Sequence, residues 1–155
     1  FLQHSLEENP EDLYIKDGNI VETIQKDNNF QSIVKKIVEE KGKDKNSFEF
    51  NSKDYVNHEY DWAFNDKDLY FALHLVDLKI SALKNNDKWK LDIKIHDIYD
   101  YSKAKDLIQY YNDTNSIPKS ILSSSLYNLA AFSNYFNVIK IYEINIEFTI
   151  NGYQQ

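Results

Sequence analysis

Apolar and polar residues alternate along three stretches of the chain, and alternation with a period of two predicts β-strands. The first two stretches lie on either side of the turn-forming segment Lys84-Asn85-Asn86-Asp87-Lys88, which predicts an antiparallel hairpin. A third stretch alternates from Tyr142 to Ile150 and is expected to join the same sheet. We therefore expect strands at about 75–83, 88–98 and 140–150. The apolar residues that would face the core in the hairpin are Val76, Leu78, Ile80, Ala82, Trp89, Leu91, Ile93 and Ile95.

Helical spacing of apolar residues predicts two longer helices, at about 29–41 and 118–135. The first is expected to begin at an Asn28 or Asn29 cap and to end at Gly42, and the second to begin at Pro118. The remainder of residues 1–47 also reads as helical, with a short helix at 1–6, before Pro10, and another at 20–24. Phe48 and Phe50 alternate with Glu49, which predicts a short strand at residues 48–50. Residues 54–61 are rich in tyrosine, asparagine and acidic residues, which predicts a loop. The expected fold is α+β: an antiparallel sheet of at least three strands covered by helices, in a single domain of residues 1–155.

The composition narrows the class of protein. A chain of 155 residues with 42% hydrophobic and 15% aromatic residues can bury a core of its own. No run approaches the roughly 18 apolar residues of a membrane helix. Cysteine is absent, which excludes disulfides, thiolate metal sites and a cysteine nucleophile. The net charge is −7 and all 18 basic residues are lysines, so we expect no nucleic-acid partner.

The second hairpin strand leads into the acidic segment His96-Asp97-Ile98-Tyr99-Asp100. Strand alternation predicts that Asp97 and Tyr99 face the core and that His96 faces the other side. A carboxylate facing the core is costly unless it is hydrogen-bonded, paired or bound to a metal. Asp97 and Asp100 are therefore candidate ligands for a divalent cation such as Mg²⁺ or Ca²⁺, and candidate acid/base groups beside Tyr99. The alternative is that Asp97 caps a turn and Tyr99 simply packs.

Histidines supply the other candidate acid/base groups. His74 precedes the first hairpin strand and is expected near the end of the sheet, while His96 lies on the charged face. The alternative for each is a solvated or hydrogen-bonded structural histidine. None of the four histidines has the i, i+4 partner of a helical zinc site. Neither a glycine-rich phosphate loop nor a G-x-S-x-G nucleophile motif is present.

Three blocks of the chain resemble a C-terminal toxin domain of the polymorphic toxins that bacteria export against competitors. They are residues 2–14, Asp68-Leu69-Tyr70-Phe71-Ala72-Leu73-His74, and His96-Asp97-Ile98-Tyr99-Asp100-Tyr101. The resemblance implies a secreted effector domain of a longer protein, which acts on or in a target bacterial cell during interbacterial competition. It also implies a cognate immunity protein. A start at Phe1 without any methionine agrees with a domain taken from a longer chain.

The Asp-x-Tyr-Asp spacing of Asp97, Tyr99 and Asp100 is similar to the acidic motif of the colicin M family. That family cleaves lipid II at its pyrophosphate linkage with a divalent cation. A His-Arg pair follows the motif in the family, whereas residues 105–107 here read Lys-Asp-Leu. The resemblance implies an antibacterial hydrolase of the phosphodiesterase or pyrophosphatase type, with an envelope precursor or membrane as its partner. The alternative is a non-enzymatic toxin or binding domain that acts on a membrane or a surface protein.

Overall fold

The computed structural model describes the chain except for residues 2–3, 5–6, 56–58, 74–75, 100–139 and 155. The chain divides into two compact units. One unit comprises Phe1–Glu11 and Ile98–Tyr142, and the other comprises Asp12–Asp97 and Glu143–Gln155. The second unit holds the body of the sheet and its helices.

The sheet has five strands in the order β1-β5-β4-β3-β2. Their bounds are β1 Leu13–Ile15, β2 Ser47–Asn51, β3 Asp77–Asn85, β4 Lys88–Tyr99 and β5 Tyr142–Tyr153. β2 pairs antiparallel with β3, and β3 pairs antiparallel with β4. β1 pairs parallel with β5 over three residues, with Leu13 opposite Ile144. The fold is therefore α+β with a mixed, mostly antiparallel sheet.

The β3–β4 hairpin turns on two residues, Asn86 and Asp87, between Asn85 and its strand partner Lys88. Both turn residues have positive φ, 47° for Asn86 and 63° for Asp87. Positive φ at both central positions is typical of a type I′ turn, whose twist matches that of the strands it joins. The alternation predicted for this hairpin is observed, since the inward row of β4 is buried from Trp89 onward.

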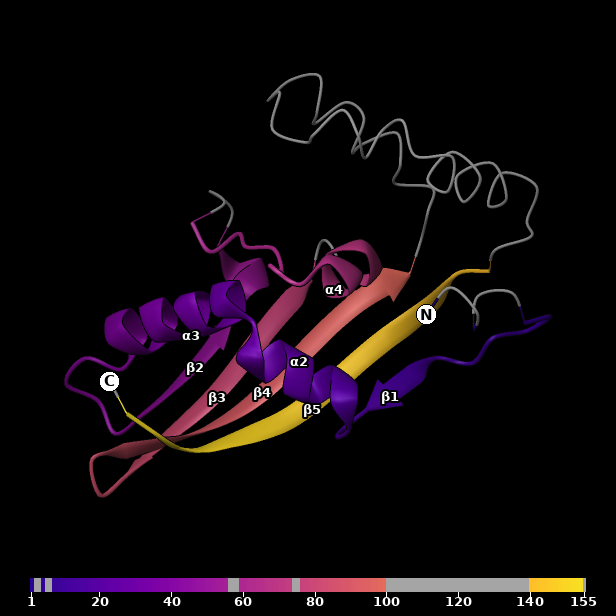
Figure 1. The fold of residues 1–155 in the computed structure, drawn as a ribbon. Coiled ribbons are helices and arrows are strands. Elements are labelled where there is room, and N and C mark those ends of the chain that lie inside the picture. Colours follow the sequence, from indigo (N-terminus) through magenta and orange to yellow (C-terminus); the bar gives the residue numbers. More distant parts are fainter. Residues whose placement is uncertain (2–3, 5–6, 56–58, 74–75, 100–139, 155) are drawn as a thin grey trace. The chain divides into compact units, whose positions relative to one another are not determined.

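Helices cover one face of the sheet (Figure 1). They are α2 Asn19–Lys26, α3 Asn28–Lys41 and α4 Lys67–Ala72, with a short 3₁₀ turn, η1, at Ser52–Asp54. The Phe30 ring of α3 lies 5.9 Å from the Phe148 ring of β5, so this helix packs directly on the sheet. Gly42 ends α3 at a point where a Cβ atom would lie 2.8 Å from the Trp89 side chain of β4. The helix C-terminus therefore sits close against the sheet.

The structure confirms the three predicted strands, the helix at 29–41, the short helix near Ile24 and the strand around Phe48. Two predictions are wrong. Residues 13–15 form β1 rather than a helix, and the N-cap of α3 is Asp27 rather than Asn28 or Asn29. The predicted helix at 118–135 lies outside the described residues, as does most of the one at 1–6. Residues 54–61 contain the end of η1, and their remainder is only partly described.

Candidate functional site

Asp97 occupies the inward row of β4, in line with Ile93 and Ile95. Its side chain is buried, with 5% of its surface exposed, and Asp27 is the other buried charged residue of the described chain. Alternate side chains of β4 face the core, and near the end of the strand this alternation makes the Asp97 carboxylate face the core as well. Asp97 is not isolated, because it takes part in an interaction within the protein.

Tyr99 follows on the same inward row but belongs to the other compact unit. There its ring stacks on Tyr142, with 5.0 Å between ring centres, and lies 6.4 Å from the ring of Phe1. The Tyr142 hydroxyl donates to the backbone carbonyl of Phe1 at 2.8 Å. His4 packs edge-on against Tyr142 at 4.8 Å. Tyr99 is thus part of an aromatic cluster within this unit.

Asp100 and His74 lie outside the described residues, so the structure does not place them beside Asp97. Within the part of the chain that is described, no group of three or more His, Asp or Glu side chains is arranged to hold a metal ion.

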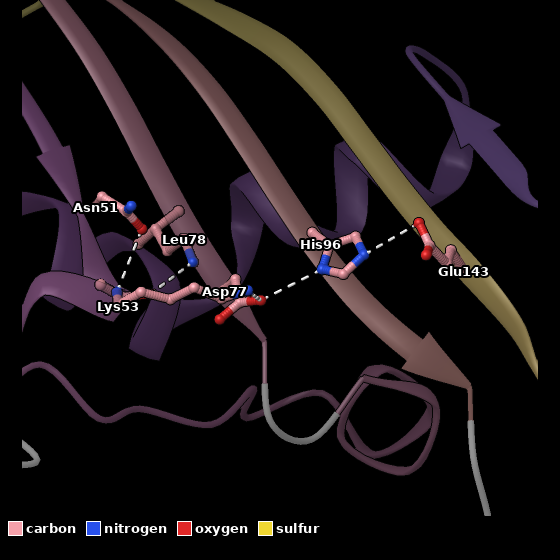
Figure 2. A network of polar contacts seen from close by, with 7 residues as sticks. Asn51, Lys53, Asp77, Leu78, His96 and Glu143 are labelled. Atoms are coloured by element: carbon pink, nitrogen blue, oxygen red, sulfur yellow. Dashed lines mark hydrogen bonds and ion pairs between the residues drawn. The ribbon is translucent and has the colours of Figure 1, made fainter. Parts of the chain in front are cut away.

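His96 lies on the open face of the sheet, opposite to Asp97, between carboxylates from the two neighbouring strands (Figure 2). Its Nδ1 is 3.3 Å from Asp77 of β3, and its Nε2 is 3.4 Å from Glu143 of β5. Asp77 also pairs with Lys53 at 2.7 Å. A neutral imidazole can donate to only one carboxylate at a time, and the long distances and part exposure make each contact weak. The arrangement joins three strands, and the described contacts around His96 are with carboxylates and include no nucleophile.

Asp27, which is not among the site residues predicted from the sequence, accepts four backbone hydrogen bonds. One oxygen accepts the backbone N–H groups of Asn29 and Phe30, both at 3.0 Å, and so caps α3. The other accepts those of Asn65 and Asp66, at 2.7 and 2.8 Å. An aspartate before an apolar helical stripe is a capping signal, but nothing in the local sequence indicates the second pair of donors.

A second missed cluster surrounds the last turn of α3. The ammonium of Lys41 lies 4.5 Å from the centre of the Tyr55 ring and 5.0 Å from that of Tyr60. Hydrogen bonding to Tyr60, and then to Tyr55, raises the pKa of Lys41 above its ordinary value. Burial raises the pKa of Tyr60, whose hydroxyl also donates to Glu40 at 2.6 Å. These groups hold the segment after β2 against α3 through cation–π and hydrogen-bonding contacts.

An open groove of about 750 Å³ lies between the start of α3 and the C-terminal half of β5. Most of the side chains that line it are uncharged, and several carry amides or hydroxyls. The lining residues are Gln25, Asn28, Phe30, Gln31, Ser32, Val34, Lys35, Thr149, Ile150, Asn151 and Tyr153. This volume lies within the range of ligand-binding clefts.

Comparisons with known proteins add no relative: no family model, no curated protein and no solved structure matches the chain. Among the described helices, none is both long and apolar enough to cross a membrane.

Proposed function

We propose that the chain is a secreted antibacterial toxin domain that cleaves a phosphoester or pyrophosphate bond in a cell-envelope precursor such as lipid II. The observation that supports this proposal is the buried Asp97, a carboxylate in the core-facing row near the end of β4. Burying a carboxylate is costly unless it is hydrogen-bonded or paired, and Asp97 does take part in an interaction within the protein. An aspartate at a core position, where the preceding positions of the row hold isoleucine, supports a role beyond packing. Perturbed or buried ionisable groups concentrate at functional sites.

In this proposal Asp97 supplies the acid/base group, because a carboxylate shielded from water interacts more strongly with the charges of a substrate. We also propose that Asp97 and Asp100 together bind a divalent cation, Mg²⁺ or Ca²⁺. The described residues alone do not form such a site, so no step of the reaction is assigned to the metal. His96 is placed on the opposite face of β4, so a reaction centred on Asp97 does not use it from this position.

The test compares two aspartates of the same strand. Asp97→Asn removes the buried charge, and Asp92→Asn removes an exposed charge on the open face, where Asp92 accepts a hydrogen bond from Thr149. Both variants and the parent are expressed in bacteria with and without an export signal, and survivors are counted by plating. We expect Asp97→Asn to reduce killing by at least about 100-fold, the usual cost of losing an acid/base group, and Asp92→Asn to kill like the parent.

Killing only after export would support an envelope target. Cleavage of purified lipid II, with added Mg²⁺ or Ca²⁺ and with a chelator, tests the substrate and the cation directly. Circular dichroism and urea unfolding of Asp97→Asn establish that the variant is folded. If a folded Asp97→Asn protein kills as well as the parent, the enzymatic proposal is wrong and the non-enzymatic alternative takes its place.

A further inference from the structure

The outer edge of β5 is only partly covered. β5 runs from Tyr142 to Tyr153, and its parallel partner β1 covers just the three residues 144–146. Beyond them, the outer edge of residues 147–151 pairs with no strand of the described chain, and Figure 1 shows β5 extending past β1. Gly152, with φ of 71°, lies one residue before the end of β5. An uncovered strand edge presents unpaired N–H and C=O groups that can template another strand.

The same stretch of β5 forms one wall of the groove described above. Thr149, Ile150 and Asn151 line that wall, and residues from the first two turns of α3 line the opposite one. A strand edge that faces a helix across a groove is the geometry in which domains bind extended peptides by strand addition. The backbone of the edge supplies the hydrogen bonds, and the groove receives alternate side chains of the peptide.

The lining of the groove indicates what kind of segment fits. Its only charged residue is Lys35, which already pairs with Glu39 at 3.8 Å. Ile150 continues the inward row after the buried Phe148, yet its own side chain is only partly covered. Phe30 and Val34 lie on the same groove lining. Phe30 and Val34 are themselves fully buried, so an uncharged segment with an apolar side chain facing inward would cover Ile150.

We propose that this groove binds an extended, uncharged peptide segment of a partner protein, which adds as a strand beside residues 147–151 of β5. An apolar side chain of the segment packs against the partly exposed side chain of Ile150, and the amide side chains of α3 bind the flanking polar groups of the segment. A second copy of this chain is a poorer occupant, because two molecules that each carry a net charge of −7 repel one another. The proposal does not depend on the chemistry of Asp97.

The probe is a synthetic hexapeptide of alternating threonine and valine, capped at both ends so that it carries no charge. Binding is followed by NMR through the backbone amides of residues 147–151, both as chemical-shift changes and as hydrogen-exchange rates. We expect saturable shifts at peptide concentrations up to about 1 mM, an affinity typical of a short strand without optimised contacts. We also expect exchange of the outward-facing amides in this stretch to slow by at least about tenfold at saturation.

Two lysine substitutions provide a matched pair. Ile150→Lys places a charge in the groove, while Leu83→Lys places one on an exposed apolar side chain of β3 that does not line it. We expect Ile150→Lys to weaken peptide binding by at least about tenfold and Leu83→Lys to leave it unchanged, with unfolding curves confirming that both variants are folded. A peptide with proline at its central valine, which cannot complete the ladder, is expected to bind more weakly.

Three results would overturn the proposal. They are an absence of amide protection at saturating peptide, an equal loss of binding in the two lysine variants, or protection that appears on raising the protein concentration without peptide. The last result would assign the edge to a second copy of the chain. None of them bears on the Asp97→Asn killing assay, so the two proposals fail independently.

Discussion

Removing the Asp27 carboxylate is expected to destabilise the fold more than removing an otherwise similar helix cap. Asp27 caps α3 and Asp66 caps α4, and in both the oxygen Oδ1 accepts two backbone N–H groups of the helix. Asp27 differs because its second oxygen also accepts the N–H groups of Asn65 and Asp66. Comparison of Asp27→Ala with Asp66→Ala therefore isolates the two long-range hydrogen bonds.

The magnitude follows from the number and type of bonds. Loss of a helix cap costs about 1 kcal/mol, and this cost applies to both variants. A hydrogen bond to a charged group contributes about 1.5–3 kcal/mol, and we take the lower end because the Asn65 and Asp66 donors are only part-buried. Two such bonds add about 3 kcal/mol for Asp27 alone. We expect losses in the free energy of unfolding of about 4 kcal/mol for Asp27→Ala and about 1 kcal/mol for Asp66→Ala.

Urea unfolding followed by tryptophan fluorescence measures both values, and the slope against urea should stay constant between variants. Hydrogen exchange should show faster exchange of the Asn65 and Asp66 amides in Asp27→Ala, because these donors lose their acceptor. If the two variants lie within about 1 kcal/mol of each other at equal slope, the long-range bonds contribute little and the reasoning is refuted.

Three further measurements test other parts of the fold. Gly42→Ala should lower the free energy of unfolding by about 1–3 kcal/mol, because the added Cβ would lie 2.8 Å from the Trp89 side chain; unchanged urea unfolding would contradict this. Asp87→Gly should raise the free energy of unfolding by up to about 1 kcal/mol in the same assay, since Asp87 has φ of 63° and glycine avoids the cost of about 1–2 kcal/mol of that conformation. This gain exceeds the roughly 0.5–1 kcal/mol of chain entropy that glycine loses on folding, and a fall in stability would contradict the turn assignment. An NMR titration should give His4 a pKa above 6.5, because its ring donates to the Glu11 carbonyl, and an ordinary or lower value would be inconsistent with that bond. The resulting stabilisation is present below pH 6.5 and is lost as the pH rises through the raised pKa.

The sequence by itself determined the elements whose signal is local. Alternation on either side of the turn-forming segment 84–88 predicted the β3–β4 hairpin, because a period of two directs alternate side chains to one face of the sheet. The same alternation placed Asp97 in the core and His96 on the open face, and both placements are observed. The apolar stripe of α3 was equally clear, since the buried face of an amphipathic helix repeats every 3.6 residues.

Tertiary structure alone decided the features that join distant parts of the chain. β1 has only three residues, too few to show a period, and exists as a strand because it pairs with β5. Asp27 meets donors 38 and 39 residues away, and the partners of His96 come from two other strands. The groove beside β5 brings residues of α3 together with residues 149–153 of β5, beyond the stretch that pairs with β1. Local periodicity records which side of an element is buried, whereas the groups that meet across elements depend on how the whole chain packs.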